Sequence, residues 1–222
     1  MRKLTYTIKE NECNDLTYKL FMEMSGINKE GRKFQRMKDD AAKIREQIQD
    51  RIDIHIACHY YDNIEFKGRA VNIGGEIFTC PAFELIDPTT IKGAYVYALT
   101  AGEYDFKEQS IMNRLYADIW GTSFTEAARI LLSREIGKTD KLSDSFGPGF
   151  FGMDVSQMDK VDKLIDFKQL GIKLTESKIL IPVKSCAGIY FSITDNYKFL
   201  NRACVDCYGS ETSCKLCRQR DN

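Results

Sequence analysis

Four cysteines near the C-terminus have the spacing of a metal site. Two CxxC pairs, Cys204 with Cys207 and Cys214 with Cys217, are separated by six residues. Each pair can place two thiolates on one cation, and two pairs complete a tetrahedral set of sulfur ligands. Both zinc and an iron–sulfur cluster suit such a site. The spacing therefore predicts a structural zinc site or a redox-active cluster, with free thiols as the third alternative.

The remaining cysteines and the two histidines are weaker candidates. Isolated cysteines most often serve as small buried hydrophobic residues. We expect that role for the other four: Cys13, Cys58, Cys80 and Cys186. His55 and His59 lie four residues apart on a segment that alternates like a strand, so both should face the same side. They could bind a metal, but we expect them to lie on a partly exposed face of the strand.

A glycine-rich loop is the candidate ligand site. Residues 147–149 read Gly-Pro-Gly, and glycine lets a ligand approach the backbone closely. Phe146, Phe150 and Phe151 offer flat apolar walls, although a tight aromatic turn over the core explains them equally well. Two acids, Glu126 and Glu176, are ordinary exposed residues unless they point toward this loop.

Composition restricts the classes to which the protein can belong. The chain has 222 residues, of which 43% are hydrophobic, so it can form a core and one domain with a small appendage. Its 32 basic and 32 acidic residues cancel, which gives no general attraction to nucleic acid or to a membrane surface. The first ten residues lack the apolar run of a secretory signal, and no segment is long enough to span a bilayer. We expect a cytoplasmic protein.

Helix and strand patterns alternate along the chain. Residues 32–53 carry one apolar stripe and an otherwise charged surface, as a solvated helix does. Gly121 should weaken the helix that contains it unless another group packs closely there. The patterns predict helices over 14–24, 32–53, 105–136 and 156–170, and strands over 4–8, 54–61, 64–71 (paired with 54–61), 94–100, 179–183 and 188–193.

The C-terminal half of this pattern resembles the activation domain of cobalamin-dependent methionine synthase. Residues 174–177 (LTES) lead through Pro182 to residues 187–192 (AGIYFS), which is the order found in that family. Residues 147–150 look like the family's Arg-x-x-Pro-Gly-Tyr loop, in which this chain has Ser145 at the arginine and Phe150 at the tyrosine.

Stand-alone bacterial members of the family extend the resemblance. They have a strand similar to residues 98–102 and a Gly-Ser-x-x-x-Glu helix similar to residues 121–126. Order and spacing agree over roughly residues 90–195, and such members can also end in a cysteine-rich tail. The resemblance implies a C-shaped α+β domain with a central, largely antiparallel sheet over residues 1–199, followed by a cysteine-rich metal-binding tail over 200–222.

The resemblance also implies a function. In that family the domain brings S-adenosylmethionine to a corrinoid in its cob(II) state, and a flavodoxin or ferredoxin-type reductant supplies the electron. A carboxylate would favour the sulfonium cation, and the protein orients a reaction that the cofactor carries out. No catalytic residue is assigned. The implied cofactor-binding residues are Glu126, Gly147, Pro148, Gly149, Phe150, Glu176 and Tyr190.

Two alternatives remain open at this point. The chain could be a non-catalytic module that binds a corrinoid protein and carries a structural zinc tail, or an iron–sulfur electron-transfer partner on the same scaffold. In each case the expected partner is a corrinoid protein or a cobalamin-dependent methyltransferase, with no nucleic acid and no membrane.

Overall fold

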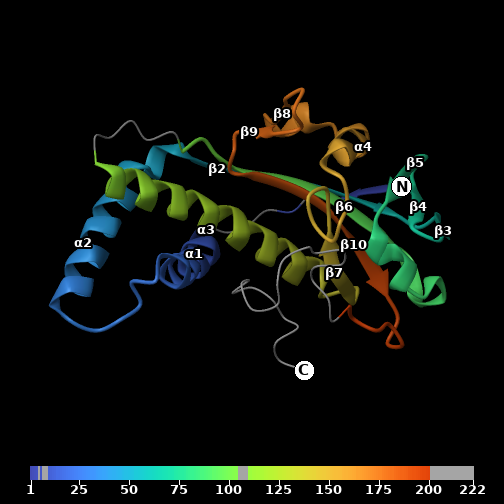
Figure 1. Cartoon of the computed structure of the whole chain (residues 1–222), viewed down its shortest axis with the longest axis horizontal. Helices are drawn as coiled ribbons and strands as arrows, with labels where there is room; N and C mark the ends of the chain where they lie inside the picture. Colours follow the sequence, from blue (N-terminus) through green and yellow to red (C-terminus); the bar gives the residue numbers. More distant parts are fainter. Residues whose placement is uncertain (5, 7–9, 105–109, 201–222) are drawn as a thin grey trace.

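A five-stranded antiparallel sheet forms the centre of the molecule (Figure 1). The structure, a computed structural model, describes residues 1–4, 6, 10–104 and 110–200. The strands lie in the order β1 (Arg2–Leu4), β2 (Ile52–Tyr61), β6 (Ile91–Gly102), β10 (Ser185–Ile193) and β7 (Leu142–Phe146). This arrangement confirms the predicted α+β fold with a central antiparallel sheet.

Both faces of the central strand β6 are covered, which explains its almost continuous burial. Side chains alternate across a strand, so Tyr95, Tyr97 and Leu99 point to one face. Ala94, Val96 and Ala98 point to the other face and belong to a different part of the core. The sheet therefore separates two layers, and a site in one layer cannot share side chains with the other.

Three helices cover the face on which Tyr97 lies: α1 (Glu10–Ser25), α2 (Arg32–Gln47) and α3 (Ile111–Ile136). Trp120 of α3 contacts both α1 and α2. Its ring stacks on Phe21 at a centroid distance of 3.8 Å, and its indole N–H donates to the carbonyl of Ala41 at 3.0 Å. Ser110 caps the start of α3 by accepting a hydrogen bond from the amide of Asn113. No helix within the described ranges combines the length and the apolar character needed to cross a bilayer.

The opposite face carries shorter elements around an aromatic core that includes Phe83, Phe146 and Phe191. A three-stranded sheet, one α-helix, a two-stranded hairpin and several 3-10 turns make up this layer. Their bounds are β3 (Ile64–Lys67), β4 (Ala70–Ile73), β5 (Glu76–Thr79), α4 (Met158–Ile165), β8 (Lys173–Leu174) and β9 (Leu180–Ile181), with 3-10 turns at Pro81–Leu85, Pro88–Thr90, Val155–Gln157 and Phe167–Leu170. A further 3-10 turn, Gln49–Arg51, joins α2 to β2.

One predicted strand pairing is wrong. Residues 64–71 do not pair with β2, because β1 and β6 occupy its two edges. They are split instead at a turn that contains Gly68, whose φ of 57° suits glycine, and β3 folds back on β4. Strand β7 was not predicted at all, since its sequence, Leu-Ser-Asp-Ser-Phe, lacks β-branched residues.

Two predicted helices are shorter than expected. The helix predicted over 32–53 ends at Gln47, and its last residues form a 3-10 turn and the start of β2. The helix predicted over 156–170 is interrupted at Asp166, which adopts a left-handed conformation with φ of 59°. Asp154 caps the 3-10 turn that leads into α4, since its carboxylate accepts from the amide of Ser156.

Candidate functional site

Glu126 belongs to an ion pair on α3. Arg129 follows one turn later on the same face of the helix and donates hydrogen bonds to both carboxylate oxygens. Its Nε donates to Oε2 at 2.8 Å, and its Nη2 donates to Oε1. About a third of each side chain is exposed, 29% for Arg129 and 33% for Glu126. The pair is therefore reachable from solvent but partly shielded by the protein.

Arg129 also connects α3 to the sheet. Its Nη1 donates to the hydroxyl of Tyr190 on β10 at 2.8 Å. The ring of Tyr190 stacks on Tyr97 of β6 at a centroid distance of 5.1 Å, and the Tyr97 hydroxyl lies 2.8 Å from Oγ of Ser145 on β7. One helix and three strands thus contribute to a single polar cluster, which we call the α3 cluster: Glu126, Arg129, Tyr190, Tyr97 and Ser145.

Gly188 makes this arrangement possible. It lies opposite Tyr97 in the pairing of β10 with β6. A Cβ at this position would come within 2.9 Å of the Tyr97 hydroxyl and 2.7 Å of the Phe146 carbonyl. The absence of a side chain therefore lets the Tyr97 ring lie over the backbone of β10 and reach Ser145.

Burial controls the electrostatics of the cluster. Burial raises the pKa of Tyr190, although the nearby Arg129 guanidinium opposes the shift. Burial also raises the pKa of Tyr97 well above its ordinary value, and it raises the pKa of the neighbouring Cys186 thiol to about 12. The hydrogen bonds that Arg129 donates to Glu126 raise the pKa of Arg129. At neutral pH the phenols of Tyr190 and Tyr97 are consequently neutral and the Arg129 guanidinium is charged.

The glycine-rich loop begins directly beside this cluster. A Cβ at Gly147 would lie 2.9 Å from the Ala187 carbonyl, so the loop leaves β7 in close contact with β10. The amide of Phe150 donates to the Gly147 carbonyl, and the amide of Gly149 donates to the Met153 carbonyl. The Phe150 side chain is 65% exposed, whereas Pro148 is buried. The other two aromatic residues, Phe146 and Phe151, pack against each other in the core of the opposite layer.

The overall fold matches a solved domain. The crystal structure of the MetH reactivation domain bound to AdoHcy superimposes on this chain with a TM-score of 0.65. The match covers 90% of this chain and 80% of that one, at 16% sequence identity. The chain has the reactivation-domain fold. No protein-family model and no curated protein matches the sequence.

Within the reactivation-domain fold, only some of the predicted site residues meet. Arg129 bridges Glu126 and Tyr190, and Gly147, two residues after Ser145, lies against the backbone of Ala187 and Gly188 in β10. Glu176 does not join them, since it is exposed in the turn between β8 and β9. Figure 1 shows this hairpin on the other side of the main sheet from α3, and Leu174 and Leu180 pack into that layer.

Arg129 is the site residue that sequence analysis missed. The sequence signal was present, because an acid and an arginine three residues apart on a predicted helix can pair. The contact with Tyr190 was not foreseeable, since it joins residues 61 positions apart in the chain. Another group does pack closely against Gly121, as its place inside a helix predicted. A Cβ there would lie 2.8 Å from the Tyr104 ring and 2.9 Å from the aliphatic chain of Lys184.

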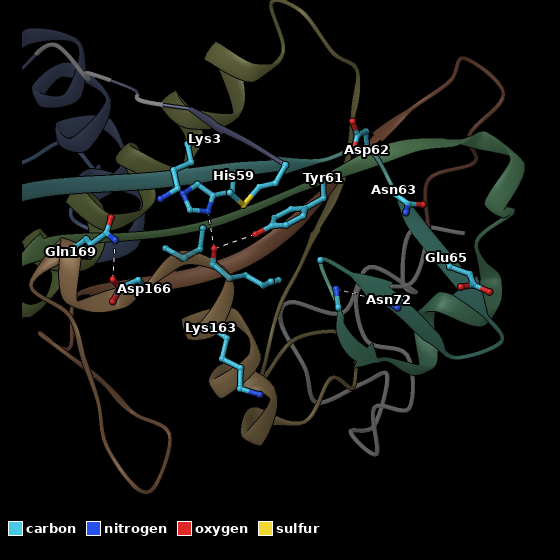
Figure 2. A pocket seen from close by; sticks show the side chains of 15 residues that line it. Lys3, His59, Tyr61, Asp62, Asn63, Glu65, Asn72, Lys163, Asp166 and Gln169 are labelled. Carbon is cyan, nitrogen blue, oxygen red and sulfur yellow. Dashed lines mark hydrogen bonds between the residues drawn. The ribbon is translucent and has the colours of Figure 1, made fainter.

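His59 corrects a prediction, because it is buried and does not lie on an exposed strand face. Only 6% of it is exposed. Its Nδ1 lies 2.7 Å from the carbonyl of Leu164, which also accepts the hydroxyl of Tyr61 at 3.2 Å (Figure 2). These contacts satisfy a carbonyl at the C-terminal end of α4. His55 remains half-exposed and contacts Asp53.

A polar cavity of about 640 Å³ lies above His59 and Tyr61. Figure 2 shows Asp62, Asn63 and Lys163 around it, with Asp166 accepting a hydrogen bond from Gln169. The cavity borders α4 and the β3–β5 sheet, in the layer opposite the α3 cluster. Its lining includes no residue of the α3 cluster and none of the Gly147–Gly149 loop.

The isolated cysteines largely follow expectation. Cys13, Cys58 and Cys80 are buried, whereas Cys186 is only half-buried. No cluster of histidine, cysteine and acidic side chains suited to a metal occurs in the part of the chain that the structure describes. The four cysteines of the predicted metal site, Cys204, Cys207, Cys214 and Cys217, lie outside the described residues, so the tail metal stays a prediction.

Proposed function

We propose that this chain binds an S-adenosyl ligand beside α3 and supports the reductive reactivation of a corrinoid-dependent methyltransferase. The observation that carries the proposal is the fold, which is shared over 90% of the chain with a reactivation domain bound to AdoHcy. The α3 cluster supports it, since Arg129 bridges Glu126 and Tyr190 there, and the Gly147 loop begins two residues after Ser145 of the cluster. The corrinoid would be presented by a partner protein, and a flavodoxin or ferredoxin-type protein would supply the electron.

The proposed reaction needs three components: the methyl donor, the electron donor and the corrinoid of a partner protein. The corrinoid of the partner protein would supply the cobalt chemistry, in which one electron from the reductant reduces the cob(II) state and S-adenosylmethionine gives up its methyl group, leaving S-adenosylhomocysteine. The residues of this chain would bind and orient the methyl donor and keep it near the corrinoid surface. The partly exposed members of the cluster are the Glu126–Arg129 pair and Ser145, whereas the tyrosine rings are buried.

Calorimetry tests the binding step directly. We expect the full-length protein to bind both S-adenosylmethionine and S-adenosylhomocysteine, and Glu126→Ala to weaken both. Glu135→Ala is the matched control, because Glu135 lies on the same helix and pairs with an exposed lysine, Lys138. Absence of binding at millimolar ligand, with and without a corrinoid protein, would reject the donor role.

A second assay tests reactivation. The cobalamin-binding domain of a methionine synthase, prepared in the cob(II) state, is mixed with S-adenosylmethionine and a low-potential chemical reductant that supplies the electron. We expect methylcobalamin to form faster when this chain is present, as followed by visible absorption. If the chain binds the corrinoid domain without raising the rate, the non-catalytic binding module becomes the better description.

The metal content of the purified protein distinguishes the three alternatives for the tail: zinc, an iron–sulfur cluster or free thiols. We propose that residues 200–222 form a distinct metal-binding tail. Protein purified without oxygen should then contain either zinc without visible colour or iron with cluster absorption. Substituting Cys204 and Cys217 by serine should remove that metal. A protein that holds neither metal would leave free thiols as the description of the tail.

A further inference from the structure

The Glu126–Arg129 pair occupies the charged part of the proposed ligand site. Three nitrogens of the guanidinium donate: two to the carboxylate and one to the Tyr190 hydroxyl. Both carboxylate oxygens are engaged by the arginine. The carboxylate is therefore not free to attract a cation, and the guanidinium is not free to receive an anion, while the pair stays closed.

A ligand with a single charge would gain little from opening this pair. It would compensate one partner and leave the other partly buried without its counter-charge, and this penalty offsets part of what the new contact contributes. A zwitterion avoids this problem, because its anionic group can replace Glu126 on the guanidinium while its cationic group replaces Arg129 on the carboxylate. In an α-amino acid these two groups are joined through one carbon, so both can enter the space between two side chains that were in direct contact.

We propose that the Glu126–Arg129 pair is exchanged for the amino-acid end of the ligand, with its carboxylate bound by Arg129 and its ammonium bound by Glu126. This inference rests on the proposed function and names the ligand class, an adenosyl compound that carries an α-amino acid. Arg129 suits the role because its planar guanidinium can hold a carboxylate through two parallel hydrogen bonds. The Tyr190 hydroxyl holds one edge of the guanidinium in place, which keeps it oriented when Glu126 moves away.

The exchange predicts a ligand preference that can be measured. S-adenosylhomocysteine carries the amino-acid end, and 5′-methylthioadenosine lacks it but retains the adenosine and the thioether. We expect the wild-type protein to bind S-adenosylhomocysteine about tenfold to a hundredfold more tightly, the range for a charge-assisted contact. Arg129→Met should lose this preference by weakening S-adenosylhomocysteine while leaving 5′-methylthioadenosine nearly unchanged. A purely structural role for Arg129 would weaken both ligands equally.

Two further variants keep the test decisive. Arg129→Lys retains the charge without the planar fork, so it should fold even if Arg129→Met does not, and it should lose most of the preference. Lys138→Met removes the basic partner of an equally spaced but exposed pair, Glu135–Lys138, and should keep the wild-type preference.

Each remaining outcome has a definite meaning. Equal binding of both compounds by the wild-type protein overturns the exchange but leaves the proposed adenosyl site standing. An unchanged preference in Arg129→Lys and Arg129→Met also overturns it. Failure of the wild-type protein to bind either compound rejects the proposed function and the exchange together.

Discussion

At the scale of single residues, the site depends on close contacts that only small side chains permit. The Tyr97 ring packs against Gly188, and Gly147 lies against the backbone of β10. Each has backbone atoms where a Cβ would be, so neighbouring side chains cannot simply rotate away. These positions therefore couple the geometry of the α3 cluster to the stability of the sheet.

Gly188→Ala should destabilise the protein and disturb the site. The added Cβ would lie 2.7 Å from the Phe146 carbonyl and 2.9 Å from the Tyr97 hydroxyl. We expect the free energy of unfolding, measured with urea, to fall by about 1–3 kcal/mol, as for other overpacked positions. The exposed Ser177→Ala is the control and should stay within about 0.5 kcal/mol of wild type. An unchanged stability for Gly188→Ala would contradict the packing described here.

At the scale of elements, α3 links the helical layer to the sheet. Its N-terminal half packs on α1 and α2 through Trp120, and its C-terminal half packs on β6 and β10 through Ala128 and Leu132. Lys184, just before β10, bonds to Asp118 and Thr122 of the same helix. The helix is thus held along its length, which positions Glu126 and Arg129 over Tyr190.

Trp120→Phe should weaken the contact between α3 and its neighbouring helices. The variant loses the indole hydrogen bond to Ala41 and part of the stack on Phe21. We expect the free energy of unfolding to fall by about 1–2 kcal/mol, as measured by circular dichroism. Tyr18→Phe, at a mostly exposed ring nearby, should have little effect. Equal stability of both variants would mean that the helical layer does not depend on Trp120.

At the scale of the whole molecule, the two layers enclose several buried groups that ionise only at high pH. Burial raises the pKa of the fully buried Cys58 thiol to about 12, and it also raises the pKa values of Tyr104 and Tyr197. These groups stay neutral in the folded protein, whereas the unfolded chain loses their protons at lower pH. The folded state is consequently favoured below the unfolded pKa and disfavoured as pH rises.

Stability should therefore fall on the alkaline side. For Cys58, the unfolded chain binds fewer protons than the folded protein between about pH 9 and 12, so the free energy of unfolding decreases as pH increases. The slope from this one group reaches about 1.4 kcal/mol per pH unit. Urea unfolding at a series of pH values measures it. Cys58→Ala should be less stable near neutral pH but should show a shallower alkaline slope, and an unchanged slope would count against the burial of this thiol.

The sequence predicted individual helices and strands better than it predicted which strands pair with one another. Apolar periodicity identified α1, α2, α3, β2, β6 and β10 to within several residues, because a helix or strand needs its own repeating pattern to bury one face. The pairing of residues 64–71 was wrong, since a strand's partner depends on which other strands occupy its edges. Strand β7 was missed because its propensity is weak and its stability comes from pairing with β10.

The sequence by itself determined the glycines of the loop and the acid on α3, because each depends on local patterns or on residue type, and the fold class followed from the family resemblance of its C-terminal half. Only the tertiary structure decided that Glu126 is paired with Arg129, that Arg129 reaches Tyr190, and that Glu176 lies in the other layer. The physical reason is that a binding site is made of contacts between segments distant in sequence, and those contacts exist only after the sheet has separated the two layers.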